Sequence, residues 1–421
     1  MLVSAVLLGV CIVILLGVPI AVALGLVAIV TMVATVGPDL LVIFIQRTYA
    51  GTTSFPLLAI PFFILSGALM MSGTLGQKLV RFAATLVGRF PGGLTQVTVV
   101  GSTIFGGVSG SAVAEASALG TMLIPWQKRE GYPGAFGAAT TASSAVIAGL
   151  IPPSIPLILY AAVSNASIAS LFLAGILPGL MLAAGMMIVC YVSGRVRNFP
   201  LLTEKITPRD ILNATVTALP ALLMPVFILV LLRLGIATPT EVSVIAVAYA
   251  LLVSVLIYRD LTIKRVYGAL VGTVVTTGVV MLVIAASNLV GYVLITEAVP
   301  NAVAQYAQTV LQEPWLIILA MNAIMLVVGM FLDLPAAILL LGPTFVAVGT
   351  AIGIDPIQLG IMMAVNLSIG LFTPPIGTTL FIAAAIAREP IGAIVRELWP
   401  FYLVAIVVLG LVSYVPAFTL Y

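Results

Sequence analysis

The sequence predicts an all-α polytopic membrane protein built from two inverted repeats, each with a re-entrant helical hairpin and a broken transmembrane helix. Of its 421 residues, 62% are hydrophobic and 7% are charged, whereas soluble domains carry about 25% charged residues. A double proline occurs once in each half, at Pro152-Pro153 and at Pro374-Pro375, 222 positions apart. The composition therefore predicts a membrane protein, and the recurring proline pair predicts an internal repeat.

Composition also excludes several functions. The apolar runs are long, which is typical of membrane helices and not of the alternating strands of a barrel. The chain has no histidine, so imidazole metal sites and histidine-based catalysis are excluded, and it has no Gly-Lys-Ser/Thr loop for ATP hydrolysis. An intramembrane enzyme with a serine–lysine or paired-aspartate site is disfavoured, because no lysine lies in a predicted span. We therefore predict that the chain is not an enzyme.

The predicted elements fall into five consecutive segments. In chain order these are residues 1–93 (N-terminal scaffold spans), 94–193 (first hairpin, first broken helix and the following span), 194–310 (linker and scaffold spans), 311–398 (second hairpin and second broken helix) and 399–421 (C-terminal span). Residues 2–36 form either one tilted span or two short ones. They lack a basic flank and a cleavage site, so we expect a retained span and not a signal peptide.

The hairpins are predicted from apolar stretches that are interrupted in the middle. Residues 94–126 are interrupted at 106–111, and residues 311–350 are interrupted at 329–335. Each arm has about 15 residues, or about 22 Å of helix, which is too short to cross a hydrocarbon core of about 30 Å. An apolar segment that cannot cross must turn back, so both stretches are predicted to be re-entrant.

The broken helices are predicted at residues 135–163 and 358–387. A proline pair lacks two amide protons and its rings clash with the preceding turn, so a continuous helix is excluded. The backbone groups freed by the break must meet protein, water or an ion. Two such segments at corresponding positions of two halves indicate the binding site of a secondary transporter.

The distribution of charge predicts that the halves are inverted. Of the 16 Lys and Arg residues, 14 lie in the loops that start at Gln77, Lys128, Gly194, Arg259 and Arg388, and the exceptions are Arg47 and Arg233. Basic loops face the cytoplasm. The first hairpin is therefore predicted to open from the cytoplasm and the second from the outside.

Polar residues gather at the four interruptions. The hairpins supply Ser109, Gly110, Ser111, Glu115 and Asp333, and the broken helices supply Ser143, Ser144, Ser154, Asn366, Ser368, Thr373, Thr378 and Thr379. A carboxylate deep in a membrane is costly and indicates function. Hydroxyls and freed carbonyls suit a hard cation such as Na⁺, and the amide ends of half-helices suit an anion.

These motifs resemble a known family. G-G-V-S-G-S-A-V-A-E-A-S-A-L-G, G-L-I-P-P-S-I-P and G-L-F-T-P-P-I-G-T-T-L-F are similar to the large membrane subunit of tripartite ATP-independent periplasmic (TRAP) transporters. The resemblance implies an elevator-type transporter, like others of the ion transporter superfamily, that is driven by a sodium gradient. It also implies a small four-helix membrane subunit on a separate chain, a periplasmic binding protein and a carboxylate substrate such as a C4-dicarboxylate or sialic acid.

Two candidate sets follow from the resemblance and the interruptions together. The substrate set is Ser111, Ser154, Asp333 and Thr378. The sodium set is Ser109, Gly110, Ser144, Gly149, Gly329, Asn366, Ser368, Thr373 and Gly377.

The sequence predicts sodium-coupled import of an organic acid anion by a multi-pass protein of the bacterial inner membrane. The substrate would come from a binding protein, and no nucleic acid is involved. The alternative is a stand-alone divalent anion/sodium symporter that needs no binding protein. A channel is disfavoured, because broken helices in inverted repeats favour alternating access.

Overall fold

The computed structural model describes residues 9, 12–13, 16–35, 41–201 and 207–419, and every regular element within these ranges is helical. Six of the described helices are long and apolar enough to cross a membrane, and the bent pair Phe55–Met71 with Leu75–Val87 makes a seventh if it counts as one span. This confirms the all-α polytopic prediction. Within residues 2–36 the chain turns at residues 16–19 and α2 begins at Ile20, whereas most of the residues before this turn lie outside the described residues.

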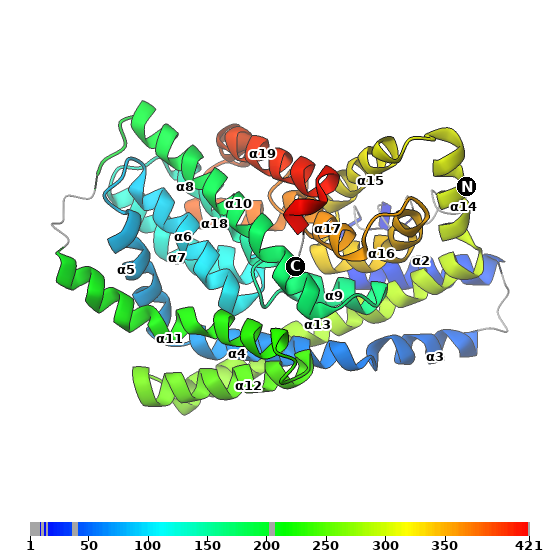
Figure 1. Cartoon of the computed structure of the whole chain (residues 1–421), viewed down its shortest axis with the longest axis horizontal. Coiled ribbons are helices and arrows are strands. Elements are labelled where there is room, and N and C mark those ends of the chain that lie inside the picture. The colour runs from blue at the N-terminus through cyan, green and yellow to red at the C-terminus, as the bar shows by residue number, and fades with distance from the viewer. Residues whose placement is uncertain (1–8, 10–11, 14–15, 36–40, 202–206, 420–421) are drawn as a thin grey trace.

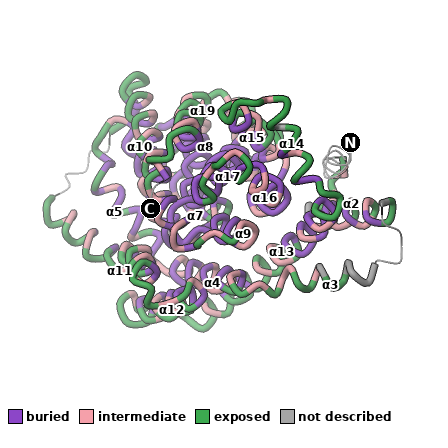
Figure 2. The backbone as a smooth tube through the Cα atoms, turned by 45° about the vertical axis from the view of Figure 1, so that its right-hand side comes forward, coloured by how far each residue is buried: buried purple, intermediate pink, exposed green. Residues whose placement is uncertain are grey.

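One side of the molecule is formed by helices with exposed apolar outer faces, which we call the scaffold helices. They are α2 (Ile20–Thr35), α3 (Leu41–Thr52), η2 (Phe55–Leu58), α4 (Ala59–Met71), α11 (Pro208–Arg233), α12 (Pro239–Leu252), η4 (Val253–Tyr258) and α13 (Ile263–Thr296). Figure 1 shows α3, α4, α11, α12 and α13 along one side of the molecule, and in Figure 2 exposed residues are frequent along α11. The scaffold helices thus present the surface that suits lipid or a membrane partner.

The other elements form the hairpins and broken helices. The hairpins are α6 (Gly93–Ser109) with α7 (Ala112–Arg129) and α15 (Pro314–Gly329) with α16 (Leu334–Ala351). The broken helices are α8 (Gly134–Ser144), η3 (Ala145–Gly149) and α9 (Ile155–Ser164), and then α17 (Pro356–Gly370) and α18 (Thr378–Ala387). They are completed by α5 (Leu75–Val87), α10 (Ile168–Val196), α14 (Val299–Val310), α19 (Ile391–Tyr414) and η5 (Pro416–Thr419). Figure 2 shows that buried residues concentrate in the hairpins and broken helices.

The offset of 222 residues holds for whole elements as well as for the proline pairs. α7 and α16 match end to end, α8 and α17 start at matching positions, and both proline pairs have cis peptide bonds. The packing repeats as well. α4 packs on α12 just as α13 packs on α2, and α9 packs on α16 just as α18 packs on α7. The repeat is therefore a property of the fold.

The ends of the elements show that the halves are inverted. Three side-chain contacts join the basic loops at one end of the molecule: Lys128–Glu389 at 2.9 Å, Arg197–Glu397 at 2.8 Å and Thr74–Asp260 at 2.8 Å. The base of the first hairpin lies at this end. The start of α17 instead meets the far end of α9, where the Tyr160 hydroxyl donates to Pro356 O at 2.7 Å.

Three expectations about elements need correction. The helix α14 was not anticipated. It is the counterpart of α5, and both are short amphipathic helices that lack a long apolar run. The last span begins at Ile391 and not at 399, because Pro390 provides the helix start and the polar residues that follow remain helical. Finally, α16 has 18 residues and is long and apolar enough to cross by itself, so length alone does not make this arm re-entrant.

Candidate functional site

The tip of the first hairpin rests on the first proline turn. Gly110 has a left-handed backbone (φ 60°), and a side chain there would overlap the carbonyl oxygen of Pro153. Ser111 caps α7, its Oγ accepting from the Ala114 amide at 3.4 Å, and Ser109 ends α6 beside the same turn. Close backbone approach therefore brings Ser109, Gly110 and Ser111 to the break in the first broken helix.

The hydroxyls of the first broken helix are already used within the protein. Ser154 Oγ donates to Gly149 O at 2.6 Å and accepts from the Leu157 amide at 3.3 Å, so it caps α9 and closes the turn. Ser144 Oγ accepts from Ser102 Oγ at 2.9 Å, which ties α8 to the first hairpin. These contacts fix the shape of the turn, and they occupy the Ser154 and Ser144 hydroxyls with partners inside the protein.

The tip of the second hairpin rests on the second broken helix in a corresponding way. The Ile376 amide donates to Met330 O at 3.2 Å, and a side chain on Gly370 would overlap the backbone of Gly329. Asp333 precedes α16 as its N-cap, is partly buried, and makes no capping hydrogen bond with its side chain. The backbone amide of Leu334 lies beside its carboxyl group.

The second broken helix leaves several buried oxygen atoms without a hydrogen-bond partner. Asn366 is fully buried, and its Nδ2 donates to Asn322 O at 3.0 Å and to Asn322 Oδ1 at 2.7 Å. Asn366 Oδ1, Ser368 Oγ and Thr378 Oγ1 have no partner. A buried oxygen without a donor is costly, and a hard cation satisfies such oxygens. These residues fit the predicted sodium site.

Thr373 and Gly377 complete the second turn. The Thr373 hydroxyl donates to Ile369 O at 2.6 Å, so it caps the preceding turn of α17. Gly377 is the N-cap of α18, where a side chain would collide with Leu371 O and Thr373 O. Both residues therefore shape the turn.

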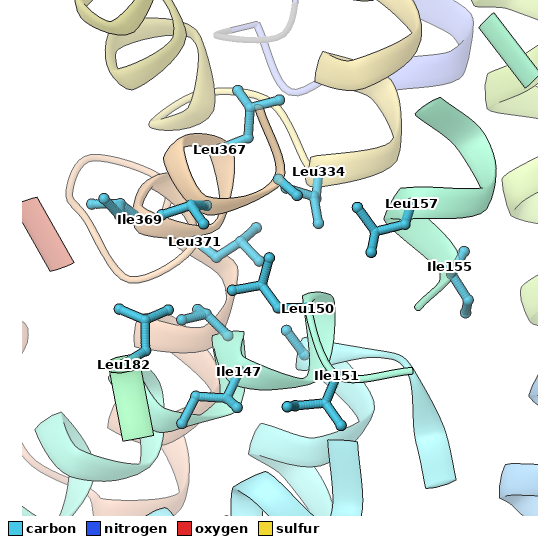
Figure 3. Close-up of a cluster of buried hydrophobic side chains, with 14 of the residues drawn as sticks. Ile147, Leu150, Ile151, Ile155, Leu157, Leu182, Leu334, Leu367, Ile369 and Leu371 are labelled. Atoms are coloured by element: carbon cyan, nitrogen blue, oxygen red, sulfur yellow. The ribbon is translucent and has the colours of Figure 1, made fainter. Parts of the chain in front are cut away.

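The two broken helices meet at the centre of the molecule. A side chain on Gly149 would lie 3.2 Å from Ser368 Oγ and 3.7 Å from Leu334, so residues of both halves converge there. The Thr379 hydroxyl lies 3.0 Å from Ala142 O and 2.9 Å from Leu371 O, one in each broken helix. Figure 3 shows an apolar cluster that includes Leu150, Leu334 and Leu371. The candidate polar groups thus lie next to a packed apolar core.

A cavity of about 360 Å³ lies between α3, α13, α9 and α16, and another of about 260 Å³ lies at the first hairpin tip. The smaller cavity is lined by Ser109, Ser111 and Glu115, by α4 and by residues Gly272 to Thr276 of α13. It therefore separates the first hairpin from the scaffold helices. Asp333 does not line it, so the structure does not gather the whole substrate set around one cavity.

Two polar residues of the site were not anticipated. Asn322 in α15 pairs with Asn366, and Ser102 in α6 pairs with Ser144. A lone amide within the apolar run of residues 314–329 was a signal that could have indicated Asn322, because such a group needs a partner in a membrane. Ser102 had no comparable signal, since serine often bonds back to its own helix.

Comparisons with known proteins give a consistent result. The family described as "Tripartite ATP-independent periplasmic transporter, DctM component" matches residues 7–418. The chain is 37% identical over 374 residues to the C4-dicarboxylate TRAP transporter large permease protein DctM of Pseudomonas aeruginosa, covering 89% of this chain and 86% of the relative. It is 36% identical over 375 residues to the sialic acid TRAP transporter large permease protein SiaM of Vibrio cholerae, covering 89% and 88%.

A protein of Sinorhizobium fredii without an assigned function is 52% identical over 376 residues, covering 89% of this chain and 90% of that protein. Among solved structures, the YdaH transporter of Alcanivorax borkumensis matches with a TM-score of 0.63 at 14% identity, covering 91% and 90%. This likeness shows the fold alone. The family match and the two TRAP permeases aligned over most of their length show the family as well. The chain belongs to the large-component family of TRAP transporters and is a multi-pass transporter permease, not an enzyme.

Proposed function

We propose that this chain imports a small organic acid anion across the bacterial inner membrane in symport with Na⁺. A periplasmic binding protein delivers the substrate, and a separate four-helix membrane subunit lies against the scaffold helices. Two relatives are named for C4-dicarboxylate and sialic acid, both carboxylates. The observation that carries the proposal is the seating of each hairpin tip on a proline turn, with unpaired buried oxygens beside the second.

Helix N-termini supply the attraction for a carboxylate. The half-helices α7, α9, α16 and α18 all begin at a hairpin tip or a proline turn. The N-terminus of a helix carries a partial positive charge and free amide groups, which favour anions. No Lys or Arg is then needed near the substrate, in agreement with their absence from residues 266–387.

Sodium binding is supported by the unpaired oxygens of the second broken helix. Asn366 Oδ1 and Ser368 Oγ are buried acceptors without donors, and the C-terminal end of α17 adds backbone carbonyls. Sodium would satisfy these groups and stabilise the turn that holds the second hairpin tip. Substrate and sodium then favour the same closed arrangement, which is the basis of coupling.

The proposed movement is of the elevator type. Contacts such as Thr379 with Ala142 tie the broken helices of the two halves to each other, so hairpins and broken helices move as one block. The scaffold helices stay in place, and the cavity at the first hairpin tip lies at the boundary between them.

The test is a thermal-stability measurement of the chain purified with its small subunit, with Na⁺ titrated against K⁺ at constant ionic strength. A ligand stabilises the state that binds it, so we expect a saturable rise in Tm with Na⁺ alone, which Asn366→Ala should blunt. Identical Na⁺ and K⁺ curves would count against sodium coupling.

Uptake into proteoliposomes then tests the substrate. We expect Asp333→Asn to lower uptake at least about tenfold, equivalent to about 1.4 kcal/mol. Glu313→Gln, an exposed N-cap without a side-chain bond, is the control and should leave uptake unchanged. Uptake that is equally fast without any binding protein would favour the stand-alone symporter instead.

A further inference from the structure

One buried carboxyl group has no role in the proposed sodium and substrate sites. Glu115 lies in the first turn of α7 and is 1% exposed. Neither of its side-chain oxygens has a hydrogen-bond partner, yet the residue lines the 260 Å³ cavity between the first hairpin and the scaffold helices. It is therefore an unpaired carboxyl group at the boundary across which the hairpin is expected to move.

No positive charge faces this carboxyl group. Helix α7 packs against α6, α8, η3 and α18, and the cavity adds α4, α13 and Ile155 of α9. The first four of these elements and α4 contain no ionisable residue. On α13, Lys264, Arg265 and Tyr267 are exposed near its start, about 8 Å or more along the helix from Gly272 at 1.5 Å per residue, and Tyr292 lies near its far end. Tyr160 of α9 donates to Pro356 O.

The neighbouring residue Ser102 favours a protonated acid. Ser102 lies beside the carboxyl group, but its hydroxyl proton is donated to Ser144 Oγ at 2.9 Å. Both lone pairs of Ser102 Oγ are then acceptors, so a carboxylic O–H can donate to Ser102, whereas Ser102 has no second proton for a carboxylate. An ionised carboxylate without a partner is very costly in an apolar interior.

A metal ion is a poorer fit than a proton at this position. Sodium and calcium take several oxygen ligands. Ser102 lies beside the carboxyl group, and Ser109 and Ser111 on the same cavity wall make no hydrogen bond to it. A proton needs one acceptor.

We propose that Glu115 is a proton-binding site. The carboxyl group is protonated in this conformation, and it exchanges that proton with water in the cavity when the first hairpin shifts relative to α4 and α13. In the exchange, the O–H bond of the acid breaks, a water molecule takes the proton, and a carboxylate remains. Glu115 is not part of the sodium set, so this proposal does not depend on sodium coupling.

Infrared spectroscopy of the purified complex tests the proposal directly. At neutral pH we expect a carbonyl stretch of a protonated carboxyl group that shifts on ¹³C labelling of glutamate and is absent from Glu115→Gln. Glu130→Gln is the matched control, because Glu130 is exposed at the end of the same helix, and this variant should keep the band. Absence of the band from the labelled wild-type protein, in which nothing is substituted, would overturn the proposal.

A sodium titration at constant pH separates a proton from a metal ion. We expect the band to persist. Its replacement by a carboxylate band on adding Na⁺ would assign Glu115 to a cation site and overturn the proton assignment.

Stability against pH gives a second measurement. An acid that stays protonated when folded and ionises when unfolded makes the folded state less stable as pH rises above its unfolded range. The unfolding equilibrium then changes by about tenfold per pH unit for one group. We expect Tm of the wild-type protein to fall with rising pH relative to Glu115→Gln, whose amide is always neutral. Parallel Tm curves for the two proteins would contradict the proposal.

Discussion

The two proline turns are nearly identical in sequence but differ in exposure. From Leu150 to Ser154 every residue is buried, whereas Thr373, Pro374 and Ile376 are partly exposed and Pro375 is exposed. The first turn is covered from several sides. Gly175 of α10 approaches Leu150 O closely, and the Gly110 tip covers Pro153. One motif thus occurs once in a buried and once in a partly exposed setting.

Chemical labelling gives the largest effect that this comparison predicts. Ile376 and Ser154 occupy equivalent positions at the 222-residue offset, but Ser154 is fully buried. We expect Ile376→Cys to react with a water-soluble maleimide and Ser154→Cys to remain unlabelled until the protein is denatured. Equal protection of both positions would show that the two turns are closed alike.

Glycine substitutions test whether both turns depend on close contact with a hairpin tip. Gly110→Ala places a methyl group against Pro153 O at a left-handed backbone position, and Gly370→Ala places one against Gly329. We expect both variants to lose transport and to melt several degrees lower. Gly410→Ala in α19 meets no atom within 4 Å and should be neutral or stabilising by up to about 1 kcal/mol. Normal uptake by Gly110→Ala or by Gly370→Ala would show that the corresponding hairpin tip does not need this close contact.

The smallest effects concern the ties between each hairpin and its broken helix. Asn322→Leu removes the partner of Asn366 Nδ2 and of Ser413 Oγ, so we expect a loss of about 1–3 kcal/mol and a weaker Na⁺ response. Ser102→Ala removes the hydrogen bond to Ser144 together with the hydroxyl beside Glu115, and the bond to Ser144 accounts for a loss of about 1 kcal/mol. Urea or thermal unfolding of both variants measures the difference. A larger loss of stability for Ser102→Ala than for Asn322→Leu would contradict this prediction.

Much of the fold could be predicted from periodic hydrophobicity and the two proline pairs. The breaks at 106–111 and 329–335 lie where the structure places the hairpin turns, because glycine, serine and proline interrupt helices through local chemistry. The amphipathic α14 was missed, since a short helix with mixed polarity resembles a loop in an apolar chain. Local signals therefore indicate where helices break better than where short surface helices form.

The candidate site was only partly predictable. The sequence indicated Asn366 and Ser368 as polar groups, and the structure shows that both have buried oxygens without partners. It could not indicate that the hydroxyls of Ser154 and Thr373 are used inside their own turns, because that depends on backbone geometry. Nor could it show that Asn322 lies beside Asn366, since that contact depends on how two distant helices pack.

The hydroxyl of Thr379 lies between carbonyl oxygens of two broken helices that are 229 residues apart in the chain, at Ala142 and Leu371. A contact of this kind makes the duplicated halves mutually dependent. The second broken helix is held in part by a backbone carbonyl of the first. Although the protein contains two similar repeats, they pack into one structural unit. A damaging substitution in one repeat is therefore not compensated by the other repeat.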